Sequence, residues 1–214
     1  MTREGLILGE DGRHRCWWHG GDPLYRDYHD TEWGRPTADD RRLFEKLCLE
    51  GFQAGLSWIT ILRKRPRFRA AFADFDWTVL AGYGEEEVRH LLGDAGIVRH
   101  RGKIEAVIGN ARCMQALLEE TGSLAALVWR FAPSPAARPR PLDYATARTI
   151  TQTPESTALS RELRRRGWRF VGPTTVYAFM QAMGLVNDHL EGCCVREEVE
   201  AARRDFALAR HQPA

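Results

Sequence analysis

The sequence predicts an all-α fold. Apolar residues recur at intervals of three and four in several segments, as they do along the buried face of a helix. No segment alternates apolar and polar residues over the length of an ordinary strand, and no internal repeat is present. The chain has 214 residues, of which 43% are apolar and 28% are charged, values typical of a globular protein with an ordinary core.

The composition divides the chain into three parts. Residues 1–15 are rich in glycine and charge and are interpreted as a loose N-terminal extension. Residues 16–194 carry the helical pattern and are predicted to form a single domain. Residues 195–214 are predicted to be a charged C-terminal tail, helical from 197 to 210. Within the domain, residues 22–36 are dense in aromatics without periodicity, so an irregular packed segment is expected there.

The first long helix is predicted after Asp39 or Asp40, either of which can cap it, with apolar positions at 43, 44, 47 and 48. Further helices are expected at 58–62 after a Ser57 cap, at 66–72 with Pro66 in the first turn, and at 77–80 after Asp76. Others are expected at 85–92, 101–118 and 124–131. A basic helix capped by Ser156 or Ser160 is expected to end at Gly167, and a last one at 173–183 is expected to end at Gly184. Four prolines make 132–141 an exposed connector.

The composition excludes several classes of protein. No apolar run approaches the roughly 18 residues of a membrane span, and the N-terminus does not resemble a secretory signal. Five cysteines, an odd number spread along the chain, argue against a disulfide framework and favour thiols or metal ligands. We therefore expect a cytoplasmic protein that is monomeric and has no membrane partner.

The charge pattern leaves two interpretations open. The net charge is only +2, so the chain as a whole does not indicate nucleic-acid binding. Basic residues nevertheless cluster at 63–69, 99–103 and 161–169. These clusters fit either a local surface for a polyanion or an ordinary arginine-rich surface.

A metal half-site is indicated near the C-terminal end of the domain. His189 and Cys193 are four residues apart, so both face the same way on a helical turn. Imidazole and thiolate are ordinary zinc ligands, and Cys16 and His29 are the candidates to complete a Cys2His2 site. Such a closed site has no position for water, so the zinc would be structural and would join the two ends of the chain. The alternative is a core histidine with unrelated thiols.

A glycine hairpin between two predicted helices is the second constellation. Backbone N–H groups at the start of the second helix form an anion site, which nearby basic side chains strengthen. Such a helix-hairpin-helix binds phosphate without reading bases, although many plain helical turns also contain two glycines. The residues concerned are Gly96, Arg99, Arg101, Gly102 and Lys103.

Residues 48–58 combine a carboxylate, glycines and a large ring. Glu50 ends an apolar helical run beside a glycine, and Trp58 follows a second glycine. A carboxylate and an aromatic face around an unobstructed loop suit a pocket for a flat polar ring such as a base. The alternative is a helix end with a solvated Glu50 and a core Trp58.

Together these segments resemble the 3-methyladenine DNA glycosylase I family. The resemblance runs in uninterrupted order from residue 16 to about 194, and it rests on DPLY at 22–25, YHD at 28–30, EWG at 32–34, LEG at 49–51, QAGLSW at 53–58, AGI at 95–97, RHRGKI at 99–104, FVG at 170–172, FMQA at 179–182 and GLVNDH at 184–189. Residues 1–15 and the tail after 194 fall outside it.

The resemblance implies a base-excision repair enzyme with a helix-hairpin-helix glycosylase fold. Such an enzyme hydrolyses the N-glycosidic bond of flipped-out 3-methyladenine in alkylated double-stranded DNA and leaves an abasic site. The family's zinc ligands fall on Cys16, His29, His189 and Cys193.

The resemblance also implies the residues of the base pocket. The base-recognition carboxylate falls on Glu50, which is the candidate catalytic residue. The pocket aromatics fall on Tyr28 and Trp58, with Trp18 and Trp33 as lining.

The expected mechanism is selective binding of a labile cation. N3-methylation makes adenine cationic and a good leaving group, and the indole face of Trp58 favours a cationic ring over a neutral one. No aspartate lies between residues 102 and 142 to support the attack of water. Glu50 is therefore expected to recognise the base first and to take part in chemistry second. Leu56, beside the pocket, is the candidate that plugs the emptied base stack.

Two other functions remain open from the sequence. Lys103 follows the hairpin, where an amine could form a Schiff base in a bifunctional glycosylase and lyase, or could contact phosphate. A zinc-stapled DNA-binding module without catalysis would carry the same metal and basic residues.

Overall fold

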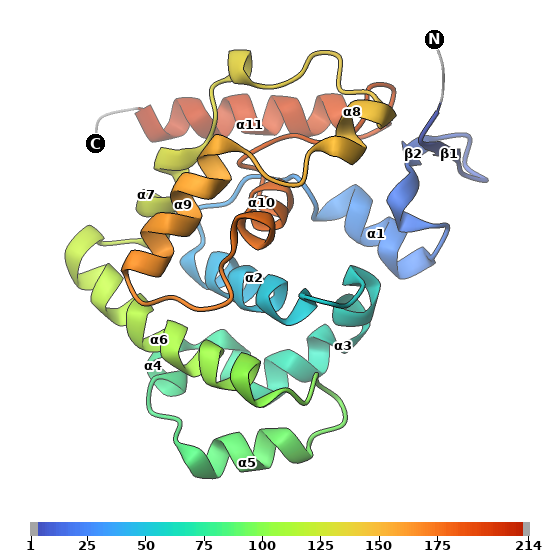
Figure 1. The fold of residues 1–214 in the computed structure, drawn as a ribbon. Coiled ribbons are helices and arrows are strands. Elements are labelled where there is room, and N and C mark those ends of the chain that lie inside the picture. Colours follow the sequence, from blue (N-terminus) through green and yellow to red (C-terminus); the bar gives the residue numbers. More distant parts are fainter. Residues whose placement is uncertain (1–3, 212–214) are drawn as a thin grey trace.

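The computed structural model describes residues 4–211, with side chains described from 4 to 206, and most of these residues lie in helices (Figure 1). Helix α2 (Asp40–Gln53) runs through the middle of the molecule. Its residues are buried on more than one side because several neighbours surround it, namely α3 (Trp58–Ala71), α6 (Arg101–Thr121), α7 (Leu124–Val128) and α10 (Pro173–Ala182). The predicted all-α fold is confirmed as far as a mostly helical architecture, which also contains one two-stranded sheet.

The remaining helices pack around this centre. Figure 1 shows α4 (Trp77–Leu80), α5 (Glu85–Gly93) and α6 on one side of α2, and α8 (Tyr144–Thr149), α9 (Pro154–Arg165) and α11 (Arg196–His211) on the other. Short 3-10 helices span Trp17–His19, Ala73–Phe75, Trp129–Phe131 and Pro135–Ala137. Within residues 4–211, no helix has both the length and the apolar character needed to cross a membrane.

A small hairpin replaces the loose extension expected at the N-terminus. Strand β1 (Leu6–Leu8) pairs antiparallel with β2 (His14–Cys16), with Leu6 opposite Cys16. Three-residue strands are too short to show an alternating pattern, so the sequence did not reveal them. The parts of the predicted extension and tail at 1–3 and 212–214 lie outside the described residues.

Residues 22–36, expected to be irregular, contain helix α1 (Pro23–Thr31). The Asp22 side chain accepts a hydrogen bond from the Tyr25 N–H at 3.0 Å, and Pro23 occupies the first helical position. This is an ordinary helix start. The helix matters for the site because it carries Tyr28 and His29 on consecutive positions.

Two boundary predictions also change. The helices expected at 58–62 and 66–72 are one helix, α3, which continues through Pro66 although proline donates no backbone hydrogen bond to the preceding turn. Helix α9 is capped by Thr153, whose hydroxyl accepts from the Ser156 N–H at 3.2 Å, rather than by Ser156 or Ser160. Helix α8, in a stretch where no helix was predicted, is also present.

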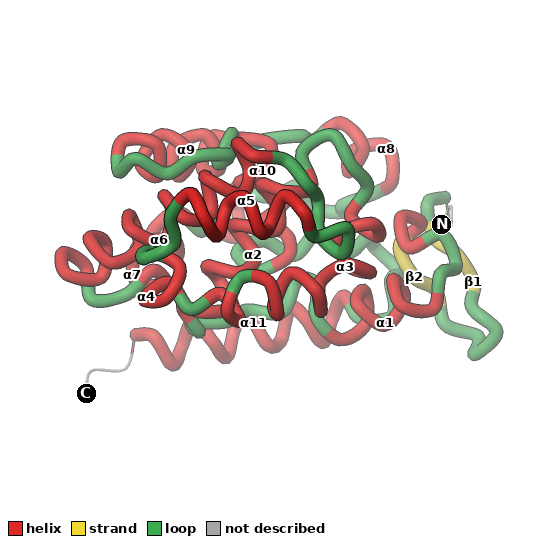
Figure 2. The backbone as a smooth tube through the Cα atoms, turned by 90° about the horizontal axis from the view of Figure 1, so that it is seen from below, coloured by secondary structure: helices red, strands yellow, loops and turns green. Residues whose placement is uncertain are grey.

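The two ends of the predicted domain meet at one end of the molecule. The Cys194 N–H donates to the His14 carbonyl at 2.8 Å, which joins the segment after α10 to strand β2. Figure 2 shows the hairpin and α1 at this end, opposite the end of α11. This junction brings side chains of the N-terminal segment close to those of the segment after α10.

Candidate active site and metal centre

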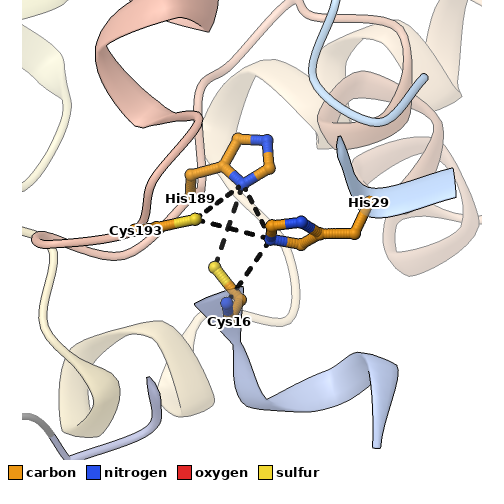
Figure 3. Close-up of side chains that lie close together, drawn as sticks. All are labelled: Cys16, His29, His189 and Cys193. Carbon is orange, nitrogen blue, oxygen red and sulfur yellow. Dashed lines mark hydrogen bonds between the residues drawn. The ribbon is translucent and has the colours of Figure 1, made fainter. Parts of the chain in front are cut away.

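Four buried side chains from the two ends of the domain converge on one point (Figure 3). His29 Nε2 lies 3.2 Å from His189 Nδ1, and Cys193 Sγ lies 3.5 Å from each of these nitrogens. Cys16 Sγ lies 3.9 Å from His189 Nδ1, and all four donor atoms fall within 4.8 Å of one another. The four residues singled out in the sequence are thus brought together.

The spacing of these atoms fits a four-coordinate metal ion. With bonds of about 2.3 Å to sulfur and about 2.05 Å to nitrogen, a tetrahedral site has a nitrogen–nitrogen edge of about 3.3 Å and nitrogen–sulfur edges of about 3.6 Å. The observed separations of 3.2, 3.5, 3.5 and 3.9 Å lie close to these values. Two thiols and two imidazoles would close the coordination sphere without an open position.

Neighbouring groups hold the histidine rings in place. His29 Nδ1 lies 2.7 Å from Asp30 Oδ1, and the Arg15 Nε–H in turn donates to Asp30 at 2.9 and 3.0 Å. His189 Nε2 lies 3.1 Å from the Trp33 carbonyl oxygen. Such contacts on the second ring nitrogen orient an imidazole for coordination. Burial raises the pKa of the Cys16 thiol, so an ion that takes the thiolate displaces a proton.

A cavity of about 250 Å³ lies next to this cluster. Tyr28 and Asp188 line it and directly precede the cluster residues His29 and His189 in the chain. Six of its thirteen lining residues are aromatic, and the wall includes Trp18, Tyr25, Tyr28, Trp33, Lys46, Glu50, Gln53, Trp58, Gln181 and Asp188.

The aromatic rings around the cavity form one continuous cluster, in which Tyr28 lies 6.4 Å from Trp18 and 6.3 Å from Tyr25, centroid to centroid. The Trp18 ring lies 4.9 Å from Tyr25 and 5.0 Å from Trp33, centroid to centroid. The Tyr28 and Trp58 rings lie 5.5 Å apart at 41°. All four aromatic residues predicted to line a pocket, Trp18, Tyr28, Trp33 and Trp58, therefore border one cavity.

A charged pair sits inside the aromatic wall. Lys46 Nζ lies 2.8 Å from Glu50 Oε1, and both side chains are buried. The same ammonium lies 3.0 Å from the centroid of the Trp58 ring and donates to the Tyr28 hydroxyl at 2.9 Å. Burial raises the pKa of Glu50, and Lys46 opposes that shift. Burial lowers the pKa of Lys46 to about 8.

Local backbone geometry explains the glycines around Glu50. A Cβ atom at Gly51 would lie 3.1 Å from the Phe170 Cβ, so the segment carrying Phe170 can approach α2 closely only at a glycine. Gly55 has a φ of 83°, a left-handed conformation that favours glycine. This turn ends α2 and starts α3, which places Trp58 across the cavity from Glu50.

Comparison with known proteins identifies the family of the chain. Residues 17–197 match the family model for methyladenine glycosylases. The chain belongs to the methyladenine glycosylase family. It is 51% identical to DNA-3-methyladenine glycosylase 1 of Escherichia coli (strain K12) over 84% of this chain and 95% of the relative. It is 44% identical to the DNA-3-methyladenine glycosylase of Haemophilus influenzae over 84% of this chain and 96% of the relative.

Solved structures give the same result. A crystal structure of 3-methyladenine DNA glycosylase I is similar with a TM-score of 0.78 and 51% identity, covering 84% of this chain and 98% of that chain. A Staphylococcus aureus 3-methyladenine DNA glycosylase I, solved to explain 3-methyladenine recognition, is similar with a TM-score of 0.75 and 36% identity, covering 82% of this chain and 93% of that chain.

The predicted hairpin of this methyladenine glycosylase family member connects α5 to α6. Gly96 lies in the turn, where its N–H donates to Asp94 Oδ1 at 2.8 Å, and Gly102 lies in the first turn of α6. Arg99 is exposed. Arg101 is paired with Glu85 at 2.9 Å.

Lys103 and Leu56 take different positions. The Lys103 ammonium is buried and donates to the carbonyl oxygens of Phe52 and Ala54 at 2.9 and 2.6 Å. It thereby holds the C-terminal end of α2 rather than projecting from the hairpin. Leu56 is 43% exposed, on the turn that Gly55 makes. It is available to contact a partner beside the pocket.

The sequence did not reveal two charged residues of the cavity. Lys46 precedes Glu50 by four residues on a helix, a spacing that does place side chains together. Asp188 accepts hydrogen bonds from the Tyr177 hydroxyl and Arg138, and from Gln181 at 2.9 Å. Gln181 and Tyr177 precede it by 7 and 11 residues and Arg138 by 50, so its partners lie beyond one helical turn and no local spacing marks it.

Proposed function

We propose that this chain is a monofunctional DNA-3-methyladenine glycosylase. It would hydrolyse the N-glycosidic bond of 3-methyladenine flipped out of alkylated double-stranded DNA and leave an abasic site. The observation that carries this proposal is the buried Glu50 carboxylate beside the Trp58 ring in an aromatic cavity of about 250 Å³. The two curated relatives described above are DNA-3-methyladenine glycosylases by name.

The side chains around the cavity suit a flat cationic ring. The base has to leave the stack to be reached, which costs a few kcal/mol. Stacking on Trp58 offsets part of this cost and favours a cation over neutral adenine. The Glu50 carboxylate can accept a hydrogen bond from the exocyclic amino group and attract the positive charge, and the Tyr28 hydroxyl adds a directional contact.

The chemistry then needs little assistance. The methylated base already carries a positive charge, so breaking its bond to the sugar releases a neutral leaving group. Water attacks the sugar carbon and loses a proton. Glu50 acts in this scheme chiefly by recognising the base, with electrostatic stabilisation of the developing positive sugar as its catalytic part.

We also infer that Cys16, His29, His189 and Cys193 hold a structural zinc ion. The tetrahedral spacing of the four donor atoms and their burial support this. A closed site of this kind offers no coordinated water, so its contribution is to hold the chain in place. Asp30 and the Trp33 carbonyl would fix the two rings from behind.

The grip on DNA is proposed to be a helix-hairpin-helix formed by α5 and α6. Gly96 lies in the turn beside the Arg67 side chain, and Gly102 lies in the first turn of α6. The exposed Arg99, and Arg101 once released from Glu85, would supply positive charge to a phosphate at the start of α6. Leu56 is proposed to fill the gap that the flipped base leaves. The enzyme is proposed to act as a cytoplasmic monomer.

The rival functions find less support. A lyase would need a free amine at Lys103, but that ammonium donates to two backbone carbonyls and is buried. A non-catalytic DNA-binding module would not need a cavity with a buried carboxylate and an indole face.

The test is release of bases from methylated duplex DNA. The wild-type enzyme is expected to release 3-methyladenine far faster than 7-methylguanine. Losing the charge-assisted contact in Glu50→Gln should lower the rate by about 10²- to 10³-fold, because about 2–4 kcal/mol of stabilisation disappears. Trp58→Ala should lower it by about 5- to 150-fold, because stacking contributes about 1–3 kcal/mol.

Glu119→Gln is the matched control, because it makes the same change of charge at an exposed position of α6 that does not border the cavity. Its base release should stay close to wild type. Unchanged release by both Glu50→Gln and Trp58→Ala would refute the pocket, and tight DNA binding without any release by the wild type would favour the non-catalytic module.

A further inference from the structure

Lys46 is a buried cation that the proposed chemistry does not use. It is 5% exposed and lies on α2, one turn before Glu50. Its ammonium touches three groups at once: Glu50 Oε1 at 2.8 Å, the Tyr28 hydroxyl at 2.9 Å and the Trp58 ring at 3.0 Å from its centroid. These are the same three groups that the proposed function assigns to the flipped base.

We propose that Lys46 is a stand-in cation that occupies the base site of the free enzyme and sets its specificity for positively charged bases. The proposal rests on the proposed function. The Lys46 ammonium lies 3.0 Å from the Trp58 ring centroid, so a base cannot stack on that face of the indole while the ammonium is there, and a second positive charge so close is also repelled. The ammonium therefore has to leave when the base enters.

The fold provides a place for the displaced ammonium. A second cavity of about 30 Å³ also borders Lys46 and Trp58. It is lined by the carboxylates of Glu32 and Glu45, which pair with Arg65 and Arg69, and by Arg42. The lysine side chain has four flexible carbons and can rotate toward these carboxylates. The charged and titratable groups around Lys46 are Arg42, Glu45 and Glu50 on its own helix, Tyr25, Tyr28 and Glu32 from the α1 region, Arg65 and Arg69 on α3, and Asp188 after α10.

In this arrangement a positively charged base is favoured because it exchanges places with the Lys46 ammonium. A cationic base replaces the contacts that the ammonium loses, so Glu50 and Trp58 keep a cation throughout. A neutral base of the same shape leaves Glu50 without a counterion and gains less from the indole face. Lys46 also keeps Glu50 ionised in the empty site, because its ammonium counters the upward pKa shift that burial causes.

The test that needs no turnover is a titration with N-methylpyridinium, a small flat cation, followed by the indole N–H NMR signal of Trp58. Lys46→Met removes the charge at similar length, so at about pH 8 it should bind the cation about tenfold more tightly than wild type. The gain should disappear when Glu50→Gln is added. Equal affinity of wild type and Lys46→Met would overturn the proposal.

Lys46→Arg provides a second variant that keeps the buried charge if Lys46→Met fails to fold. A guanidinium pairs with a carboxylate through two parallel bonds and is harder to displace. The KM for methylated DNA should rise about tenfold with kcat unchanged. A wild-type KM in Lys46→Arg would contradict displacement.

The pH profile separates this role from mere packing. In Lys46→Met the pKa of Glu50 should rise, so the acidic limb of kcat/KM should move upward by about one pH unit or more. An unmoved limb would refute the counterion role. Failure of the wild type to release 3-methyladenine would reject the proposed function, whereas the cation titration would still decide what Lys46 does.

Discussion

The four-ligand cluster permits a prediction about stability. Cys193→Ser removes one thiolate from the proposed zinc site, and a chelator removes the ion altogether. Cys194→Ser is the matched control because this cysteine is adjacent in the chain, half-buried and outside the cluster. Both variants replace a cysteine sulfur by an oxygen, so a difference in their zinc content or Tm reports the loss of a metal ligand.

The size of the effect follows from how far apart the ligands are in the chain. His29 and Cys193 are separated by 164 residues. A cross-link that closes a loop of this length restricts the unfolded chain by about 5 kcal/mol in the loop-entropy treatment. For a protein of this size, 1 kcal/mol corresponds to about 2–4 °C in Tm, so loss of the ion should lower Tm by about 10–20 °C.

The assay combines metal analysis with thermal unfolding. Freshly purified wild type and Cys194→Ser should each contain one zinc ion per chain and lose Tm when a strong chelator is added. Cys193→Ser should contain less zinc and show the low Tm without chelator. Wild-type protein without stoichiometric zinc, or with a Tm that the chelator does not change, would refute the reasoning.

Three other residues give shorter predictions. Lys103→Met should destabilise the fold by about 1–3 kcal/mol in urea unfolding, because two carbonyls lose their donor, and borohydride should trap no adduct with DNA in the wild type. Burial tends to raise the pKa of Glu32, but its bonds from Arg65 hold that pKa below its ordinary value, and stability from such a group is lost as pH falls. Glu32→Gln should therefore destabilise more at about pH 7 than at about pH 3. Arg99→Ala should weaken binding to any DNA sequence and reduce the salt slope by about one unit.

Much of the helical architecture could be predicted because it depends on local signals. Helix α2 begins where Asp39 caps it, with backbone N–H groups donating at 2.9 and 3.1 Å, and its apolar spacing marks the buried faces. His189 and Cys193 could be identified as a half-site because their ligand spacing is local too. Their partners Cys16 and His29 were found because the donor types complete a known coordination set.

Other features depend on contacts that are distant in the chain. In α1, Tyr25 and Tyr28 line the aromatic cavity rather than the core alone, so the helix shows no simple apolar period; Asp22 and Pro23 were its usable start signal. Lys46 is a charged residue, and a charged residue on a helix is ordinarily solvated. The Lys46 ammonium is buried because the centroid of the Trp58 ring lies 3.0 Å from it, and this contact is visible only in the folded structure.

The Cys16, His29, His189 and Cys193 cluster and the neighbouring cavity are built from the same segments of the chain. Tyr28 and His29 are consecutive on α1, and Asp188 and His189 are consecutive after α10, so each pair gives one side chain to the cavity and one to the cluster. Trp33 is a third link between the cavity and the cluster, because its ring borders the cavity while its carbonyl oxygen contacts His189. A shift of the two imidazoles would therefore be passed to three parts of the cavity wall, so the proposed ion, without taking part in chemistry, would still fix the geometry that is proposed to recognise the base.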